Sequence, residues 1–475
     1  MVFISFMILF FSLLSSKYTT KPILITTLII SAFTSYFMNV YHVVIDSGML
    51  RNTIQTDMHE SFDLLSFKMV LYVLFLGLIP SWFVYKMKLQ PQTVKEASIS
   101  KLKSILLSVL LIVILLFSFS KFYTSFFREH KLLRYYTNPT YWIYSIGNYI
   151  DKTLDSGSTI IKPLGLDALI IEREEPKLVI MVVGEATRAD HFSLNGYAKE
   201  TNPLLKKEKI INFPKMYACG TSTAYSVPCM FSVFDRSDYS YKKGISNENV
   251  LDVLKHTHRV DMLWRDNNSD SKGVALRVPY EDYKSSTTNT LCQEGECRDE
   301  GMLVGLDNYI NERKNRNILI VLHQMGNHGP AYYKRYPKVF EKFTPVCETN
   351  QLEECTSESI SNAYDNALLY SDYFLSKVIQ LLKKHNNSHE TSMIYMSDHG
   401  ESLGENGLYL HGLPYFMAPD AQTHIASFMW FGDETKKIDN MKSYSQDNLF
   451  HTLLGLFGVQ TEVYDKRMDI LNEHR

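Results

Sequence analysis

Four apolar stretches dominate the first 120 residues of the chain. Three of them approach or exceed the roughly 17 residues that a membrane-spanning helix needs, and the first is shorter. A buried core helix would show one polar face, and Ile105–Phe117 has none. The pattern therefore predicts an α-helical transmembrane domain over residues 1–120. Its four expected spans are Met1–Leu14, Ile23–Ile45, Met69–Tyr85 and Ile105–Ser120.

The charges between these stretches predict their orientation, because lysine and arginine mark cytoplasmic loops. Residues 15–22 and 86–103 are rich in lysine, whereas residues 46–67 carry acidic side chains against Arg51 alone. We expect the two lysine-rich loops inside, and the acidic loop and everything after Ser120 outside. The N-terminus then lies outside and lacks the positive flank of a signal peptide, which predicts a missing upstream span.

From Pro176 the pattern changes to short apolar runs separated by helical segments. Continuous apolar strands between helices are typical of a mostly parallel sheet with helices on both faces. We expect an α/β catalytic domain over residues 176–475. An aromatic and polar connector over residues 121–175 is expected to form helices at the membrane surface. The four clearest strands begin at Lys177, Asn317, Ser392 and His424.

The composition of the 475 residues excludes some functions. The chain has 49 basic and 51 acidic residues and a net charge of −2, without the basic excess typical of nucleic-acid-binding proteins. Its mean hydropathy of −0.13 resembles that of a soluble enzyme. That value is an average over an apolar membrane part and a polar exported part, so it describes neither.

All six cysteines lie in the C-terminal half. An even number confined to the exported part indicates disulfides formed in an oxidising compartment. Free or zinc-binding thiols are the alternative, and the absence of a CxxC pair weighs against them. Six cysteines permit many pairings. Their order along the chain favours the short loops Cys219–Cys229, Cys292–Cys297 and Cys347–Cys355.

Polar side chains stand at the carboxyl ends of three predicted strands, the edge where parallel α/β sheets form their sites. Glu185 follows the first strand, His323 and His328 the second, and Asp398 and His399 the third. Each residue alone could be a turn former. Together they predict a divalent-metal site, and a carboxylate-rich set with histidine suits zinc, manganese or magnesium.

Three adjacent hydroxyls precede a predicted helix in Cys219–Met230, namely Thr221, Ser222 and Thr223. The free N–H groups of a helix N-terminus attract phosphate, and a metal-bound hydroxyl loses its proton near neutral pH. One of the three is therefore a candidate nucleophile. An ordinary helix cap is the alternative, and the motif alone does not choose among them.

Four ordered motifs carry a resemblance to a known family: Glu185–Asp190, Cys219–Ser232, Asn327–Pro330 and Ser397–Gly412. They closely resemble the lipid A phosphoethanolamine transferases, which include the mobile colistin-resistance enzymes. The catalytic domain of that family has the alkaline-phosphatase/sulfatase fold. The resemblance covers nearly the whole chain. Because family members usually have five spans, it also implies that this chain lacks the first.

The resemblance implies a single tight zinc site and selects Thr223 as the nucleophile. His328 and His411 match residues that bind the phosphoethanolamine group or a second zinc, and one of them protonates the leaving oxygen. The implied zinc ligands are Glu185, Thr223, Asp398 and His399. Implied substrate contacts are Asn268, Ser269 and Lys272, with Asn52, Thr56 and Glu60 spaced along one helix face toward the lipid donor.

The implied activity is transfer of phosphoethanolamine from phosphatidylethanolamine to a phosphate of lipid A, through a phosphoethanolamine-threonine intermediate. The enzyme would be a multi-pass monomer of the bacterial inner membrane with its catalytic domain in the periplasm. Added ethanolamine makes an anionic phosphate zwitterionic, so cationic polymyxins, colistin included, bind less well. Alternatives are an acceptor in the lipopolysaccharide core, a glucan or a protein, transfer of phosphoglycerol, or a sensor that only binds a phosphorylated ligand.

Overall fold

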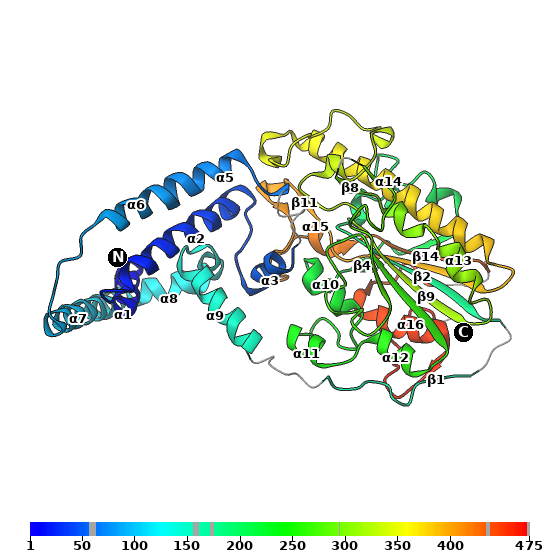
Figure 1. The fold of residues 1–475 in the computed structure, drawn as a ribbon, viewed down its shortest axis with the longest axis horizontal. Helices are drawn as coiled ribbons and strands as arrows, with labels where there is room; N and C mark the ends of the chain where they lie inside the picture. Colours follow the sequence, from blue (N-terminus) through cyan, green and yellow to red (C-terminus); the bar gives the residue numbers. More distant parts are fainter. Residues whose placement is uncertain (57–62, 155–160, 172–174, 294, 434–437, 473–475) are drawn as a thin grey trace. The chain divides into compact units, whose positions relative to one another are not determined.

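The computed structural model describes residues 1–56, 63–154, 161–171, 175–293, 295–433 and 438–472 (Figure 1). The chain divides into two compact units. The first comprises residues 1–46 and 65–147, and the second residues 47–64 and 148–475. Residues 47–64 follow the first predicted long span in the sequence, yet they group with the second unit.

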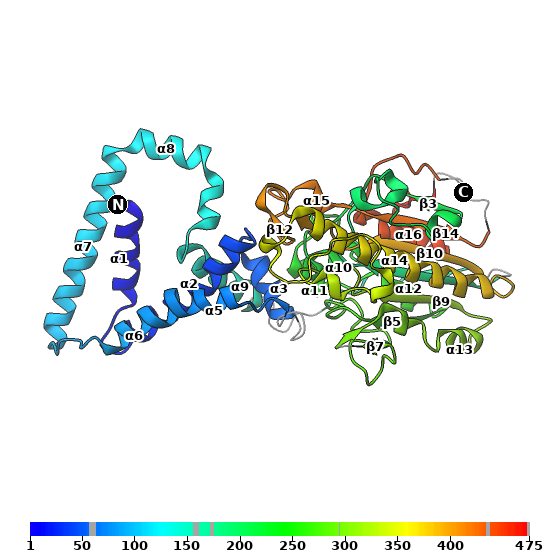
Figure 2. The ribbon, with the colours of Figure 1, turned by 90° about the horizontal axis from the view of Figure 1, so that it is seen from above.

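The first unit is helical, and three of its segments are long and apolar enough to cross a membrane. They are α2 (Thr20–Val40), α7 (Val94–Ser118) and Phe67–Lys86, which correspond to the three long apolar stretches. The segment Phe67–Lys86 consists of α5 (Phe67–Tyr72), the π-helical η1 (Val73–Leu78) and α6 (Ile79–Lys86). The shorter α1 (Val2–Leu14) lies beside α7 (Figure 2). Further helices are α8 (Ser120–Glu129), η2 (Lys131–Tyr136) and α9 (Thr140–Leu154).

A small residue brings two of these apolar segments together. A Cβ atom on Gly77 of η1 would lie 3.2 Å from the Cβ of Ala32 and 3.4 Å from the Cα of Ile29, both in α2. Small side chains at such points let helix backbones approach closely, which maximises van der Waals contact between apolar helices. A larger residue at position 77 would force these two helices apart.

A seven-stranded sheet in the order β3-β14-β10-β2-β9-β5-β6 forms the centre of the second unit. The five strands from β10 to β6 pair in parallel, which confirms the predicted mostly parallel sheet. They are β10 (Glu390–Ser397), β2 (Lys177–Gly184), β9 (Asn317–His323), β5 (Val260–Asp266) and β6 (Tyr280–Asp282).

The fourth predicted strand differs from its neighbours. The run beginning at His424 divides into β13 (His424–Ile425) and β14 (Ser427–Phe431). The strand β14 pairs antiparallel with both β10 and β3 (Ile210–Asn212), whereas β13 belongs to a separate small sheet. A continuous apolar run indicates burial on both faces but says nothing about direction, so the sequence could not reveal this reversal.

Helices cover both faces of the large sheet (Figure 1). On β2, Met181 packs with α12 (Val250–His256) and α16 (Leu449–Phe457), whereas Ile180 packs on the opposite face with α14 (Ser357–Lys384). Successive side chains of a strand point to opposite faces. Since both faces are covered, every residue of β2 is buried, which explains its uninterrupted apolar sequence.

Short elements and three disulfides complete the second unit. The structure contains the three predicted pairs, Cys219–Cys229, Cys292–Cys297 and Cys347–Cys355. The remaining α-helices are α3 (Ser47–Gln55), α10 (Thr223–Met230), α11 (Tyr241–Ser246), α13 (Leu306–Asn311) and α15 (Asp420–Thr423). The small sheets pair β13, β4 (Met216–Tyr217) and β15 (Tyr444–Ser445), β11 (Ser402–Leu403) with β12 (Tyr409–Leu410), β7 (Cys292–Gln293) with β8 (Glu296–Cys297), and β1 (Leu169–Ile170) with β16 (Val459–Gln460).

Candidate active site

Two neighbouring strands deliver carboxylates to one point of the sheet edge. Glu185 directly follows β2 and Asp398 directly follows β10, and the last residues of these strands, Gly184 and Ser397, stand opposite each other. The hydroxyl of Thr223, the first residue of α10, lies at the same point. Glu185 and Asp398 are fully buried, and Thr223 is nearly so. The strand ends therefore meet where the sequence predicted a site.

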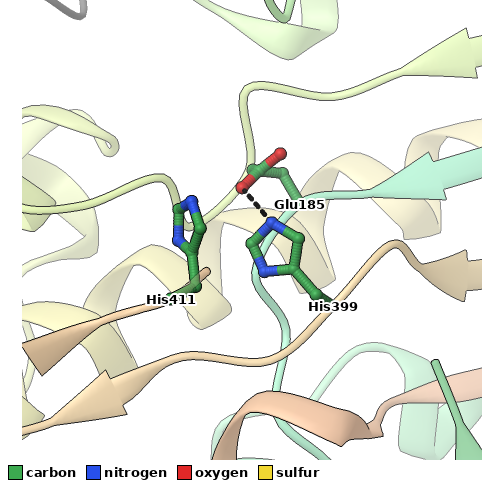
Figure 3. A group of neighbouring side chains, drawn as sticks. All are labelled: Glu185, His399 and His411. Carbon is green, nitrogen blue, oxygen red and sulfur yellow. Dashed lines mark ion pairs between the residues drawn. The ribbon is translucent and has the colours of Figure 1, made fainter. Parts of the chain in front are cut away.

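Five potential ligand atoms, from four residues, lie there at short separations. Thr223 Oγ1 lies 3.1 Å from Glu185 Oε2 and 3.3 Å from His399 Nε2. His399 Nε2 lies 3.3 Å from Asp398 Oδ2. It also lies 3.5 Å from Glu185 Oε1, and Figure 3 shows this pair. A tetrahedral zinc site with bonds of 2.0–2.1 Å has ligand-to-ligand edges of about 3.3–3.4 Å. The four measured separations, which involve both oxygens of Glu185, are close to that edge length.

Two features of the buried ligands favour a cation. His399 Nδ1 lies 2.8 Å from the carbonyl oxygen of Gly400, and this hydrogen bond directs the Nε2 lone pair into the cluster. Burial lowers the pKa of His399, which favours the neutral, ligating imidazole. Asp398 Oδ1 accepts the N–H of Ala186, whereas Asp398 Oδ2 has no hydrogen-bond donor among the described residues. A buried anionic oxygen without a donor is costly unless a cation binds it.

Asn268 contacts one of the predicted metal ligands, Glu185. Its amide nitrogen donates to Glu185 Oε2 and to the carbonyl of Gln324, both at 2.8 Å. Ser269 in turn donates its hydroxyl to Asn268 Oδ1. These bonds fix the orientation of the Glu185 carboxylate, a function that the sequence did not indicate for Asn268. Its position two residues after the end of β5 was the available signal.

The turn after β9 fits tightly against Glu185. Gly326 has φ +49°, and a Cβ there would lie 3.0 Å from the carbonyl oxygen of Glu185. Glycine meets both requirements. The buried carboxylate of Asp299 accepts the N–H groups of Met325 and Gly326 and so holds the turn in place. His323, the strand-end histidine, instead pairs with Asp266 at 2.9 Å inside the sheet.

Two further histidines stand beside the cluster. The ring centroid of His411 lies 4.1 Å from that of His399 and 5.9 Å from that of His328. His411 also belongs with Glu185 and His399 to a group whose ligand atoms lie within 4.8 Å of one another (Figure 3). Burial, and then the positive charge of Arg335, holds the pKa of His328 well below its usual value. This environment favours the neutral imidazole of His328.

Glu401 is a functional candidate that sequence reasoning missed. Its fully buried carboxylate lies 2.7 Å from His411 Nδ1 and accepts the hydroxyl of Tyr332 at 2.7 Å. A carboxylate on Nδ1 sets the tautomer of a histidine and makes Nε2 more basic. Glu401 lies only three residues after Asp398, inside a motif already singled out, but the sequence did not reveal its partner.

The helix α3 lies beside the predicted lysine. Lys272 Nζ donates to the main-chain carbonyl of Gln55, the last residue of α3, at 3.1 Å. Asn52 is part of the same helix, and the hydroxyl of Thr56 donates to its carbonyl at 2.7 Å. The structure thus brings these predicted substrate contacts near Lys272 within the second unit. Glu60 lies outside the described residues.

A second group of close ligand atoms has a different character. Cys219, Cys229 and Asp447 also lie within 4.8 Å of one another. The two sulfur atoms are bonded to each other in a disulfide, so neither is a thiolate that could bind a metal. Of these two groups in the described part of the chain, the one at the strand ends is therefore the candidate metal site.

The sequence of this chain matches two family models and several known proteins. Residues 177–459 match the sulfatase family model, and residues 3–154 match the model for phosphoethanolamine transferase EptA/EptB. Phosphatidylethanolamine transferase Mcr-2 of Escherichia coli is 46% identical over 466 residues, which cover 95% of this chain and 86% of Mcr-2.

Solved structures agree with this assignment over both units. The integral membrane lipooligosaccharide phosphoethanolamine transferase A from Neisseria meningitidis matches with a TM-score of 0.93 and 36% identity, covering 98% of this chain and 89% of that one. The C-terminal periplasmic domain of phosphoethanolamine transferase EptC from Campylobacter jejuni matches with a TM-score of 0.60 and 45% identity, covering 66% and 98%. The chain therefore belongs to the phosphoethanolamine transferase family, with an EptA/EptB-type N-terminal domain and a sulfatase-fold catalytic domain.

Proposed function

We propose that this protein transfers phosphoethanolamine from phosphatidylethanolamine to a phosphate of lipid A. The observation that carries the proposal is the position of the Thr223 hydroxyl, within 3.1–3.3 Å of Glu185 and His399 at the sheet edge. The names of two relatives support the donor and the acceptor class: one is a phosphatidylethanolamine transferase, and the other acts on lipooligosaccharide. The similarity of this chain to these proteins supports an inner-membrane location, multiple spans and a periplasmic catalytic unit.

Glu185, Thr223, Asp398 and His399 would hold one zinc ion. Magnesium prefers octahedral oxygen sites, so a compact set with an imidazole favours zinc. When bound there, zinc lowers the pKa of the threonine hydroxyl and offsets negative charge on the phosphoryl group. A second zinc near His328 and His411 remains an alternative use of those side chains.

In the first step, Thr223 Oγ1 attacks the phosphorus of the donor phosphodiester. A Thr223–phosphorus bond forms and the phosphorus–glycerol oxygen bond breaks, so diacylglycerol leaves and phosphoethanolamine stays on the threonine. The leaving oxygen must receive a proton, and the proton that the Thr223 hydroxyl gives up supplies it through a histidine. His411 is the better placed of the two histidines, because Glu401 on its Nδ1 stabilises the protonated imidazole.

In the second step, an oxygen of a lipid A phosphate attacks the same phosphorus. The bond to Thr223 Oγ1 breaks, and the proton that the attacking phosphate hydroxyl loses passes through His411 to the threonine oxygen. Lys272 is positioned by Gln55 to offset charge on the transferring group, and Asn52 and Thr56 would contact the donor lipid. The product phosphate carries an ammonium group, which weakens the attraction of cationic polymyxins such as colistin.

Mass spectrometry of lipid A tests the proposal most directly. We expect lipid A from cells that express the wild-type protein to carry one added phosphoethanolamine, and lipid A from cells expressing Thr223→Ala to carry none. Modification of core sugars or of another periplasmic acceptor, with unmodified lipid A, would contradict the acceptor but not the transfer chemistry. Absence of any phosphoethanolamine product would contradict the proposal as a whole.

Removing the charge beside His411 is expected to slow transfer. Glu401→Gln keeps the size of the side chain and an acceptor for Nδ1, but loses the carboxylate charge. We expect the transfer rate to fall by about 10- to 100-fold, as is typical for residues that orient a histidine. Glu405→Gln is the matched control, because Glu405 pairs with Arg188 at a more exposed position. Equal rates for both variants, measured with a labelled phosphatidylethanolamine donor, would argue against this role of Glu401.

A further inference from the structure

Asp63, which precedes α5, forms ion pairs with two basic residues of the second unit. Asp63 Oδ2 lies 2.7 Å from Arg335 Nη2, and Lys334 pairs with the other carboxylate oxygen. Both members of the Asp63–Arg335 pair are nearly inaccessible, with side-chain exposures of 8% and 2%. Removing one partner of an ion pair this buried leaves an uncompensated buried charge, whereas the loss of a surface pair costs little.

The same arginine reaches the candidate active site. Arg335 Nε donates to the main-chain carbonyl of His328 at 2.7 Å. Arg335 Nη1 donates to Glu296, which lies in the hairpin closed by the Cys292–Cys297 disulfide. The planar guanidinium therefore makes three bonds in fixed directions, two to carboxylates and one to the histidine turn.

The two carboxylate partners of Arg335 constrain the position of His328 through the guanidinium. Glu296 and Asp63 together fix the plane of the guanidinium, and the plane fixes the direction of the Nε–H bond to the His328 carbonyl. Without the Asp63 charge, one end of the fork loses its anionic partner and Arg335 can rotate toward Glu296. The turn Asn327–Pro330 would then lose its hydrogen bond from Arg335 Nε, although none of the predicted metal ligands is changed.

We propose that Arg335 is a positioning residue for His328, and that Asp63, supplied by the loop between α3 and α5, holds Arg335 in its working orientation. This inference rests on the proposed function, because it takes His328, whose ring centroid lies 5.9 Å from that of His411, to line the site of transfer. Asp63, Arg335 and His328 all belong to the second unit, so this chain of contacts lies within one unit. A purely structural anchor is the competing explanation, and it predicts no change at the His328 ring.

The test uses the full-length protein in detergent, with histidine rings labelled at Cε1 for NMR and with transfer kinetics on the same samples. The His328 resonance is assigned by its loss in His328→Gln. In Asp63→Asn, we expect this resonance to change its chemical shift and kcat to fall by about tenfold, because small displacements of a catalytic group are costly. Arg335→Lys, which cannot make three directed bonds, should show the same two changes.

Asp252→Asn is the matched control, because it breaks the bidentate Arg277–Asp252 pair, another pair with a buried carboxylate. It should leave the His328 resonance in place. An unchanged His328 resonance in both Asp63→Asn and Arg335→Lys would overturn the inference, and so would a changed resonance with wild-type kcat. If the wild-type protein showed no transfer at all, the proposed function would fail instead, and the two failures are thereby distinguished.

Discussion

Thr223→Ala is expected to abolish transfer and the covalent intermediate together. Alanine lacks the oxygen that forms the bond to phosphorus and that lies 3.1 Å from Glu185 and 3.3 Å from His399. We expect a loss of at least about a thousandfold in transfer rate, the scale seen when a nucleophile is removed. The measurement is diacylglycerol release from labelled phosphatidylethanolamine, with the intact mass of the protein recorded in parallel.

Two neighbouring hydroxyls provide matched controls for this experiment. Thr221 donates its hydroxyl to the carbonyl of Leu413 at 2.6 Å, and Ser222 is the residue that precedes α10. Thr221→Ala and Ser222→Ala should still form the adduct, and Thr223→Ser should form it more slowly. A donor-derived adduct on Thr223→Ala would show that another residue is the nucleophile.

The strand ends of the site could be predicted from the sequence, because burial on two faces leaves a clear signal. Uninterrupted apolar runs marked β2, β9 and β10, and the polar residues after them had to lie along one edge. The direction of β14 could not be predicted in this way, since an antiparallel strand at the same depth has the same apolar pattern. The three long apolar helices could also be predicted, because length and apolar composition are enough to identify a candidate membrane span.

The supporting roles of Glu401, Asn268 and Asp63 could not be predicted, because each role depends on partners distant in the sequence. Glu401 matters through His411 and Tyr332, and Asn268 through Glu185. Asp63 precedes its partner Arg335 by more than half of the chain, in a segment whose acidic character suggested only an external loop. Local pattern identifies which residues can do chemistry, and the fold decides which side chains orient them.

Asp398→Ala is expected to remove the metal and, with it, the activity. Asp398 is fully buried, and its Oδ2 has no hydrogen-bond donor among the described residues, so ligation accounts for an atom that the protein leaves open. Its Oδ1 also accepts the N–H groups of Ala186 and His399, which holds the two strand ends in register. We therefore expect both a loss of bound zinc and a fall in transfer rate of at least about a thousandfold.

Asp447→Asn distinguishes this role from the general removal of an acidic side chain. Asp447 lies close to Cys219 and Cys229, but their disulfide leaves no thiolate for a metal, so this variant should keep its zinc. Zinc content is measured by elemental analysis of the purified full-length proteins, and thermal unfolding confirms that each variant is folded. Full zinc content in Asp398→Ala would contradict the ligand assignment. Zinc loss in both variants would point to a site that includes the disulfide loop, because the ligand group at the strand ends does not contain Asp447.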